Sequence, residues 1–582
     1  MSQSNGPFWV FPVKNPTFFH LVTKEFNIHP VTAQILISRS LNTVEQINEF
    51  LYAKLPNLLD PELFPDMDKA VERILRAIIY NEPILIYGDN DVDGMTAATL
   101  LTEFLRSIGA KTFVDIPNRA SLKKSLIGDA LQVALKHQCK LLITVDCGIT
   151  AAKEIEEVIT HQIDVIITDH HEPTSRIPHC VATLNPKLIN STYPNRDLTG
   201  VGVAFKLAHA ITNELIEREE ISPTKIDLKS YLDLVALGTI ADMGALRGEN
   251  RVLVRYGLRQ LRKLKRIGLA KLVAVSEIDP SHITPVEIAS KIAPRLNSLG
   301  RIAEPIKGVE LLLIRDHQLA EDLARQLDLY NLERQKIEKQ ASDDIENVIY
   351  QHPEILAEKA IVLASDKWHP GVIPIISARI AKQYNRPTLI ISIEQHVGKG
   401  SIRTIPEFPL LPVLKDNSDL LLNFGGHDYA AGLTIKEENI ELFRKRFCNA
   451  AEAALKEQDI TNKLYLDAKI NFCDITFDFL ESMNLLEPFG HENPPPLLYT
   501  EAVQIWPPKV IGKYHLKLFL EQGDRMLEGV AFGLAHRKEQ LRGKNLPLRI
   551  AFTPHVNTFL NKSSIQLHIK DFQRISVAET PC

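Results

Sequence analysis

The stretch GDNDVDG, residues 88–94, decides the fold of the chain around it. It follows a short apolar run, PILIY (83–87), and precedes a segment of helical periodicity, AATLLTEFLRSIGA (97–110). Two more apolar runs end in the same way in acidic residues, KLLITVD (140–146) and DVIITDHH (164–171). Alternation of short apolar runs with helical segments is typical of a parallel sheet covered by helices on both faces.

The acidic residues at the ends of these runs point to a ligand site. Ligands of open α/β sheets bind beyond the carboxyl ends of the strands, so the acids should meet at one edge. We expect Asp89, Asp91 and Asp93 to share one face, because residues i and i+2 of an extended backbone point the same way. Three clustered carboxylates are costly unless a cation neutralises them. A solvated acidic loop is the alternative, and an EF-hand is disfavoured because no Glu stands at the twelfth position.

Histidines complete the predicted cluster. Asp146 by itself could be a helix cap, but Asp169 is followed by two adjacent histidines, His170 and His171, which packing alone explains poorly. A further acid, Asp242, follows the apolar run of DLVALGTIADMGAL (233–246), and we expect it at another strand end. Mixed Asp and His ligands without Cys favour Mn²⁺ or Mg²⁺. A pair of such ions is a common catalyst of phosphoester hydrolysis.

Length and composition set the outer limits. The 582 residues are enough for roughly three to five domains. The net charge of −5 gives no general sign of nucleic-acid binding, so such binding would need local basic patches. Six scattered cysteines form no CxxC pair, which disfavours zinc ribbons and disulfide scaffolds. The N-terminal sequence does not look like a secretory signal and no run of about 18 apolar residues occurs, so we expect a soluble cytoplasmic protein.

Hydrophobic periodicity and the positions of Gly and Pro predict how the rest of the chain is organised. Residues from Gln318 to Gln351 contain neither Gly nor Pro and have helical periodicity, which predicts a long connecting helix. Short alternating strands after about residue 463 indicate a small barrel, and an OB-type barrel would fit a nucleic-acid role. The predicted parts are a helical lead-in (1–75), a catalytic α/β domain (76–316), the connector helix (317–352), a second α/β domain (353–455) and the barrel domain (456–582).

Several motifs in this order resemble one family. They are GDNDVDG, VDCGI, TDHH, LTGVGVAFKLAHAI, VALGTIADMGALRGENR, APRLNSLGRI, GKGSIRT, FGGHDYAAG and LLEPFGHENPPP. The sequence resembles the DHH phosphoesterase superfamily and, within it, the RecJ branch of bacterial 5′→3′ exonucleases specific for single-stranded DNA. The resemblance extends from about Pro83 to Phe572. It implies a parallel-sheet DHH domain joined by a long helix to a DHH-associated α/β domain, followed by an OB-like β-barrel.

The resemblance also implies roles for individual residues. Two metal ions would be held by Asp91, Asp93, Asp146, His170 and Asp242. Asp146 would bridge the ions, Asp89 and Asp169 would be auxiliary acids outside the ligand set, and His171 would face the scissile phosphate or the leaving oxygen. Asp242 is preferred as a ligand over Asp233, nine residues earlier. The residues expected to hold the DNA are Arg119, Arg301, Ser401, Arg403 and His427, with Gly425, Gly426 and Gly432 allowing the strand to approach closely.

One segment departs from the family pattern. Members usually carry Gly-Tyr-Gly after the arginine that corresponds to Arg119, whereas this chain continues ASLKKSLIGDAL (120–131). The 5′-end contacts near Arg119 are therefore expected to differ. The implied activity is release of 5′-mononucleotides from single-stranded DNA in recombination and repair, with two Mn²⁺ or Mg²⁺ ions. A monomer working with a helicase and a single-strand-binding protein is the implied setting. The alternatives are another DHH phosphodiesterase, acting on short oligonucleotides or cyclic dinucleotides, and a catalytically silent replication scaffold.

Overall fold

The chain forms two compact units. The computed structural model describes residues 6–13, 15–118, 127–222, 224–559 and 562–575. One unit contains Lys54–Ile460 and Gly490–Glu492; the other contains the described residues before Lys54 together with most of those after Ile460. The described part of the predicted lead-in before Lys54 therefore shares a unit with the barrel segment, although more than 400 residues of the sequence separate them, whereas residues 54–75 of the lead-in belong to the larger unit.

A five-stranded parallel sheet is the centre of the larger unit. Its strand order is β3-β2-β4-β5-β6. The strands are β2 (Ile84–Gly88), β3 (Thr112–Asp115), β4 (Leu141–Val145), β5 (Asp164–Thr168) and β6 (Ala182–Leu184). Every residue of β2 and β4 is buried, as expected for a parallel sheet covered on both faces. This confirms the parallel sheet predicted from the apolar runs.

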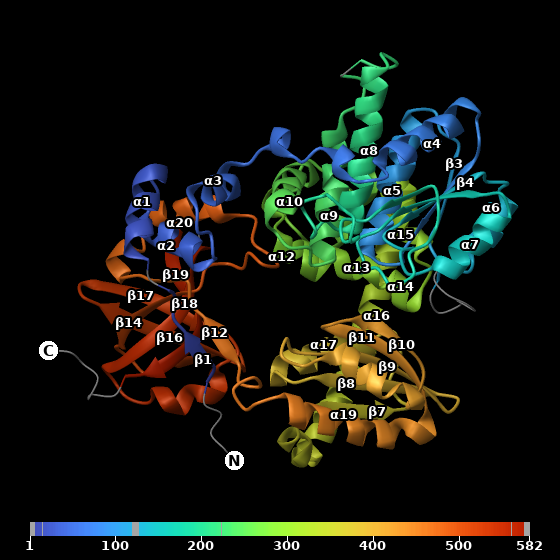
Figure 1. The fold of residues 1–582 in the computed structure, drawn as a ribbon. Coiled ribbons are helices and arrows are strands. Elements are labelled where there is room, and N and C mark those ends of the chain that lie inside the picture. Colours follow the sequence, from blue (N-terminus) through green and yellow to red (C-terminus); the bar gives the residue numbers. More distant parts are fainter. Residues whose placement is uncertain (1–5, 14, 119–126, 223, 560–561, 576–582) are drawn as a thin grey trace. The chain divides into compact units, whose positions relative to one another are not determined.

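Helices cover the two faces of this sheet (Figure 1). One face packs against α4 (Met67–Ile79), α5 (Val92–Ser107) and α8 (Gly200–Glu217), and α9 (Leu232–Ala241) packs on α5 and α8. The other face packs against α6 (Ala130–Lys136) and α7 (Ala152–Thr160). The helical segments that follow are α10 (Gly248–Leu261), α11 (Ile267–Val275), α12 (Pro285–Glu287), a π-helical turn (Ile288–Ile292), α13 (Ala293–Asn297), α14 (Leu299–Ile302) and α15 (Ile306–Leu313).

The long helix α16 (His317–Gln351) joins the two parts of this unit. Asp316 caps it, accepting hydrogen bonds from the backbone N–H groups of Gln318 and Leu319 at 2.8 and 2.9 Å. Near its start, Ala320, Ala324 and Leu327 belong to the core of the parallel-sheet domain. Near its end, Ala341, Ile345 and Ile349 pack into the second α/β domain. This confirms the long helix expected between the two domains.

The second α/β domain contains a mixed sheet of order β10-β11-β9-β8-β7. Its strands are β7 (Ile361–Ser365), β8 (Thr388–Glu394), β9 (Val397–Arg403), β10 (Leu421–His427) and β11 (Ala430–Lys436). Its helices are α17 (Ile373–Tyr384), α18 (Leu410–Asp416) and α19 (Ile440–Ala454). Strands β10 and β11 form a hairpin in which His427 pairs with Ala430, so Asp428 and Tyr429 form the turn.

The smaller unit is a β-barrel with helices packed on it. The strands of its sheet run in the order β13-β14-β18-β19-β17-β16-β15, and an additional pairing of β14 with β16 closes the sheet on itself. They are β13 (Ala468–Lys469), β14 (Leu498–Gln504), β15 (Lys509–Ile511), β16 (His515–Gln522), β17 (Arg525–Ala531), β18 (Leu546–Phe559) and β19 (Lys562–Arg574). The predicted barrel is confirmed.

The N-terminal helices complete the core of this unit. They are α1 (Pro16–Phe26), α2 (Pro30–Ser38) and α3 (Val44–Tyr52), and α20 (Phe477–Met483) joins them. The N-terminal strand β1 (Phe8–Val10) pairs in parallel with β12 (Lys463–Tyr465), which ties the start of the chain to this unit. Among the described helices of both units, none combines the length and the apolar character needed to cross a membrane.

Candidate metal centre and nucleic-acid interface

Acidic residues follow three neighbouring strands of the parallel sheet. Asp89 comes directly after β2, Asp146 after β4 and Asp169 after β5, as the sequence predicts. The carboxyl ends of parallel strands lie at one edge, so the three carboxylates stand side by side there. Asp89, Asp146 and Asp169 are buried, which sets them apart from ordinary surface acids.

The expectation of an extended backbone through Asp91 and Asp93 is wrong, because helix α5 begins at Val92. Asp91 is its N-cap and accepts a hydrogen bond from Gly94 N at 3.1 Å. The first N–H groups of a helix lack acceptors within the helix, and the carboxylate of an N-cap Asp supplies an acceptor for one of them. Asp93 lies in the first turn and accepts hydrogen bonds from the N-terminus of α8, from Gly200 N at 2.6 Å and Val201 N at 3.0 Å.

The expectation that Asp242 ends a strand is also wrong. The apolar run before it is the buried helix α9, and Asp242 is its C-cap residue. A fully buried run such as LVALGTIA shows neither helical nor strand periodicity, so the pattern could not distinguish them. Asp242 nevertheless reaches the acid cluster, whereas Asp233 forms an ion pair with Arg266 at 3.2 Å.

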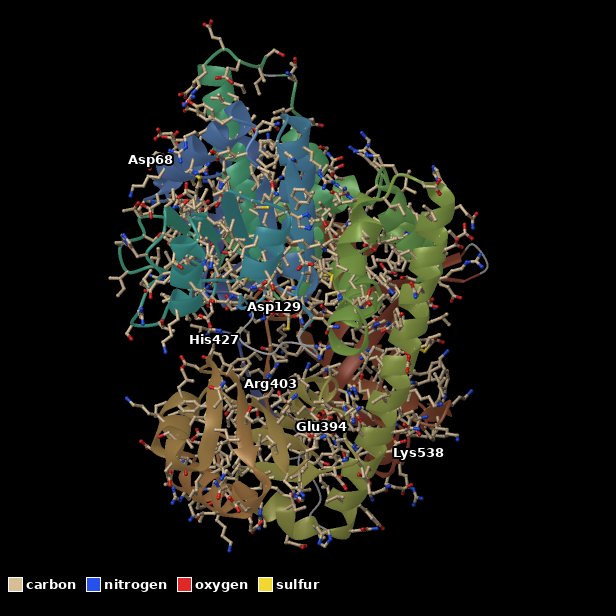
Figure 2. The ribbon with its side chains drawn as sticks, turned by 90° about the vertical axis from the view of Figure 1, so that its right-hand side faces the viewer. Asp68, Asp129, Glu394, Arg403, His427 and Lys538 are labelled. Atoms are coloured by element: carbon tan, nitrogen blue, oxygen red, sulfur yellow. The ribbon has the colours of Figure 1, made fainter. Side chains whose placement is uncertain are left out.

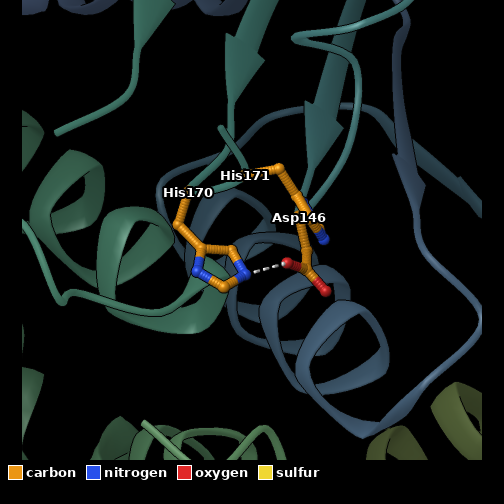
Figure 3. Close-up of side chains that lie close together, drawn as sticks. All are labelled: Asp146, His170 and His171. Carbon is orange, nitrogen blue, oxygen red and sulfur yellow. Dashed lines mark ion pairs between the residues drawn. The ribbon is translucent and has the colours of Figure 1, made fainter. Parts of the chain in front are cut away.

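His170 stands among these carboxylates (Figure 3). Its Nε2 lies 3.1 Å from Asp146 Oδ1, 3.6 Å from Asp242 Oδ2 and 3.9 Å from Asp93 Oδ2. Three overlapping groups of potential ligand atoms result, each with its atoms within 4.8 Å of one another. They are Asp93, His170 and Asp242; Asp89, Asp91 and Asp146; and Asp146, His170 and His171. Asp146 therefore belongs to two of these groups, one of acids alone and one with the two histidines.

The backbone at Asp146 is held in a conformation that non-glycine residues seldom adopt. Its φ is +60°, in the left-handed region. Gly200 packs directly against it, since a Cβ there would lie 2.5 Å from the Asp146 side chain. Unusual backbone of this kind is retained where the surroundings fix it, and it is frequent at functional sites. The start of α8 thus supplies both hydrogen bonds to Asp93 and room for Asp146.

The electrostatics of the cluster call for a cation. Burial, followed by the charge of Asp91, raises the pKa of Asp93 to about 7. Burial and the neighbouring carboxylates also raise the pKa values of Asp146 and Asp242 well above the usual range. Asp146 Oδ1 is buried and accepts no hydrogen bond from the described residues. Carboxylate oxygens with one imidazole nitrogen are the donor set expected for Mn²⁺ or Mg²⁺, so these residues fit such ions.

Asp169 and His171 form a pair of a different kind. The Asp169 carboxylate accepts hydrogen bonds from His171 Nδ1 at 2.8 Å and from the backbone of His170, His171 and Ile149. Burial alone would raise the pKa of Asp169, but the bond and charge of His171 outweigh it and lower the pKa to about 2. Burial would lower the pKa of His171, but Asp169 raises it to about 9. His171 is thus protonated near neutral pH.

The buried imidazole of His170 has the opposite electrostatics. Burial and then the positive charge of His171 lower the pKa of His170 to about 3. A neutral imidazole is the form that coordinates a metal. The two adjacent histidines are therefore electrostatically distinct, one neutral and among carboxylates, the other charged.

The second α/β domain brings further predicted residues to the site. The ring of His427 stacks toward that of His171 with centroids 5.9 Å apart. Figure 2 shows His427 and Arg403 on the side of this domain that faces the parallel-sheet domain. Ala430, which pairs with His427, also pairs with Arg403. Gly426 has no room for a side chain, because a Cβ would lie 2.3 Å from Ala430 O.

The other predicted DNA contacts are placed as follows. A Cβ at Gly425 would meet nothing within 4 Å, and one at Gly432 would lie 3.9 Å from Gly400 O, an ordinary contact, so close packing does not require glycine at either position. Ser401 is buried beside Ser377, with their hydroxyl groups 3.4 Å apart. Arg301 donates to the backbone carbonyl of Gly371 at 2.9 Å. Arg119 and the segment after it up to residue 126 lie outside the described residues.

Two residues near the centre were missed by the sequence analysis. Asn297 accepts a hydrogen bond from Val92 N at 3.1 Å and so supports the start of α5 beside the acids. Lys187 follows β6 at the same edge of the sheet and forms an ion pair with Glu172 at 3.3 Å. Asn297 lies in the quoted motif APRLNSLGRI, whereas a single lysine in a loop carries no signal of its own.

Comparisons with known proteins agree with this arrangement. The chain matches the family description "DHH family, N-terminal domain" over residues 83–239, "DHHA1 domain" over 357–453 and "RecJ OB domain" over 466–571. It is 35% identical to the single-stranded-DNA-specific exonuclease RecJ of Bacillus subtilis (strain 168) over 94% of this chain and 69% of that protein.

Solved structures show the same architecture. The RecJ of Thermus thermophilus in complex with Mn²⁺ superposes with a TM-score of 0.82 at 27% identity, over 98% of this chain and 80% of that chain. The same protein in complex with Mg²⁺ gives a TM-score of 0.75 at 25% identity, over 98% and 79% of the two chains.

Proposed function

The chain belongs to the RecJ family of DHH phosphoesterases, and from this premise we propose that it is a metal-dependent exonuclease that degrades single-stranded DNA from the 5′ end to mononucleotides. The observation that carries the proposal is the cluster of Asp93, Asp146, His170 and Asp242 at the edge of the sheet, in which Asp93 and Asp146 are buried. Such a cluster is costly without cations and useful with them. Recombination and repair are the processes in which we expect the activity to be used.

The proposed metal ligands are those predicted from the sequence: Asp91, Asp93, Asp146, His170 and Asp242. When bound, two Mn²⁺ or Mg²⁺ ions would activate a water for in-line attack on phosphorus and stabilise the charge on the attacking and leaving oxygens. Asp146 would be suited to contact both ions because it belongs to two ligand groups, one with Asp89 and Asp91 and one with His170, whose Nε2 lies 3.1 Å away. Asp89 lies with Asp91 and Asp146, so it can also serve as a ligand.

His171 is proposed to bind the scissile phosphate. Its Nδ1 donates to Asp169, which leaves Nε2 available to donate to a phosphate oxygen. The pKa of about 9 keeps the ring protonated and able to donate at neutral pH. Asp169 has the positioning role: it fixes the ring and favours its charge. His427, 5.9 Å from His171 between ring centroids, would approach the same phosphate from the second α/β domain.

The remaining contacts would hold the strand. Arg301 and Arg403 can bind phosphate oxygens through two N–H groups at once, and Ser401 through its hydroxyl. Arg119 is proposed for the 5′ end on the resemblance alone. At Gly425 nothing lies within 4 Å of the position that a Cβ would take, so the strand could approach the hairpin closely there, whereas Gly426 is required by the packing of the hairpin itself.

The barrel carries a surface suited to single strands. Trp506, which is 47% exposed, contacts the ring of Phe519 edge-on with centroids 5.1 Å apart. Lys509 and Lys517 lie over the same ring at 5.9 and 5.3 Å. Aromatic rings with nearby cations bind unpaired bases and phosphates without strong sequence preference. We therefore include this surface in the proposed binding of single-stranded DNA.

The alternatives from the sequence are not favoured. An enzyme acting on short oligonucleotides or cyclic dinucleotides would not use the barrel for substrate binding. A catalytically silent scaffold would not need a complete set of metal ligands. The proposal also includes a monomer acting in the cytoplasm with a helicase and a single-strand-binding protein. These finer points rest on the family resemblance.

One assay tests the function. Purified protein is incubated with a long single strand labelled at its 5′ or 3′ end, a blunt duplex and a dinucleotide, with Mn²⁺, Mg²⁺ or EDTA. We expect rapid release of the 5′ label as a mononucleotide from the single strand, slow attack on the duplex, and no activity in EDTA. Preferential hydrolysis of the dinucleotide, or degradation from the 3′ end, would overturn the proposal.

A further inference from the structure

A lysine outside the predicted set stands at the candidate metal centre. Lys187 follows β6, the edge strand next to β5, so it emerges at the same edge of the sheet as Asp169, His170 and His171. Neither the proposed metal ligands nor the proposed strand contacts include it. Its ammonium group adds a second positive charge beside His171 at an edge where most of the charged side chains are carboxylates.

The backbone of Lys187 is fixed relative to His171. Asn185 is fully buried, and its Nδ2 donates to the backbone carbonyl of His171 at 2.9 Å. The Oδ1 of the same carboxamide accepts from Lys187 N at 2.8 Å. One buried side chain therefore holds both residues, so the distance between their backbones is set by the fold. Arg196 adds a hydrogen bond to Lys187 O at 3.1 Å.

The charged end of Lys187 remains close to the site. Its Nζ lies 3.3 Å from Glu172 Oε1, and Glu172 is the residue that follows His171. The Lys187 side chain is only 24% exposed, whereas that of Glu172 is 58% exposed. An ion pair with so exposed a partner is weak, so a phosphate could replace the carboxylate at little cost.

The charge of Lys187 is felt by groups on both sides of the site. Burial and then the charge of His171 lower the pKa of His427, and Lys187 contributes to the same effect. Burial and the charges of Asp93 and Asp91 raise the pKa of Asp242, while His171 and Lys187 oppose the rise. The ammonium group thus lies within electrostatic reach of both domains that form the site.

We propose that Lys187 binds the DNA phosphate next to the scissile one. In the absence of DNA, Glu172 forms an ion pair with the Lys187 ammonium group, and the phosphate displaces the Glu172 carboxylate when the strand binds. The proposal rests on the proposed nuclease function and adds a substrate-binding residue to it. Asn185 is the positioning residue, since it places Lys187 with respect to His171. Lysine suits this contact because it acts as a compact point charge on a flexible stem.

The proposal predicts opposite effects for the two partners of the ion pair. At saturating Mn²⁺, Lys187→Gln should raise KM for a single strand about tenfold and reduce the slope of log affinity against log salt by about 0.7. Glu172→Gln should lower KM, by about two- to threefold, because a competitor for the lysine is removed. The double variant should behave like Lys187→Gln, and Lys187→Arg should retain most of the affinity.

A second ion pair provides the matched control. Lys271 Nζ lies 2.8 Å from Glu321 Oε2 with side chains 29% and 32% exposed, on α11 and α16. Lys271→Gln and Glu321→Gln should leave KM and the salt slope unchanged. Strands in which one phosphate is replaced by a neutral methylphosphonate, at successive positions, locate the contact. When the replaced phosphate is the one that Lys187 binds, next to the scissile bond, wild type and Lys187→Gln should have the same KM, because the contact is lost in both.

Two results would overturn the inference. The first is that Lys187→Gln and Glu172→Gln change KM in the same direction, as expected for a pair that only stabilises the fold. The second is a loss from Lys187→Gln that persists at every methylphosphonate position. A wild-type protein that degrades no single strand would instead contradict the proposed function, so the two failures are distinguishable.

Discussion

Two successive segments of helix α8 bury charge in opposite ways. At its N-terminus, Gly200 and Val201 donate to Asp93, whose neighbours Asp146 and Asp242 are also acidic. Further along the helix, Lys206 is fully buried and forms an ion pair with Glu249 at 2.5 Å. Glu249 also accepts hydrogen bonds from Tyr193 and from Leu59 N, and Lys206 donates to Leu59 O at 2.6 Å.

The difference in charge balance indicates that the Lys206 cluster stabilises the fold, whereas the Asp93 cluster binds a ligand. The Lys206 cluster is neutral in itself and ties the segment around Leu59 to the domain. The Asp93 cluster carries like charges that the protein alone does not balance, so the folded chain tolerates a repulsion that bound cations would relieve. Substitutions in the first cluster should change stability, and those in the second should change activity.

Replacing Asp146 by Asn should have the largest effect. The change keeps the size of the side chain, and Asn accepts the left-handed backbone at this position. We expect kcat/KM on single-stranded DNA with Mn²⁺ to fall at least 10³-fold, equivalent to about 4 kcal/mol. The metal-free protein should be no less stable, because one of several repelling charges is removed. Activity within tenfold of wild type would contradict the role of Asp146.

Replacing Lys206 by Met should mainly affect stability. It leaves Glu249 buried without its ion-pair partner, and we expect the free energy of unfolding to fall by about 3 kcal/mol. Chemical denaturation measures this loss. The double variant Lys206→Met/Glu249→Gln should recover part of it, and Lys271→Met, from the exposed pair, should cost less than about 0.5 kcal/mol. A loss of activity without a loss of stability would contradict the comparison.

The metal-free protein should lose stability as pH rises toward neutral. Asp93 has a pKa of about 7 in the folded chain, raised by burial and the charge of Asp91 from 3.8. The folded state therefore binds more protons than the unfolded state between about pH 4 and 7, and stability falls across this window as pH increases. Each such group can contribute at most about 1.4 kcal/mol per pH unit. Thermal unfolding in EDTA from pH 5 to 8 measures the trend; saturating Mn²⁺ should reverse it.

Local sequence patterns predicted the parts of the fold that depend on neighbouring residues. The apolar runs ending at Asp89, Asp146 and Asp169 are strands β2, β4 and β5, and the segment without Gly or Pro is helix α16. The carboxylates were predicted to gather because parallel strands present their carboxyl ends at one edge. What the structure adds is the geometry of the cluster, including the helix N-termini at Asp91 and Asp93.

Long-range packing was outside the reach of these patterns. The pairing of Phe8 with Lys463 joins the N-terminal strand to the barrel unit and leaves no trace in either local sequence. The buried run before Asp242 fits a helix or a strand equally well until its packing partners are known. Lys187 is an ordinary lysine in a loop, and only the hydrogen bonds of Asn185 show that it belongs to the site.

The smallest predicted effect tests whether the acid cluster depends on support from the following helices. Asn297 Oδ1 accepts from Val92 N, the first N–H of α5, the helix that Asp91 caps and that carries Asp93. Removing this acceptor by Asn297→Ala should cost about 1 kcal/mol, as for loss of a helix cap. If the lost bond loosens the start of α5, affinity for Mn²⁺ should fall about fivefold, measurable by calorimetry without DNA. Thr476→Ala, which removes the cap of α20 in the other unit, should cost similar stability but leave Mn²⁺ affinity unchanged. Equal Mn²⁺ affinity in the two variants would mean that the metal ligands hold their places without Asn297.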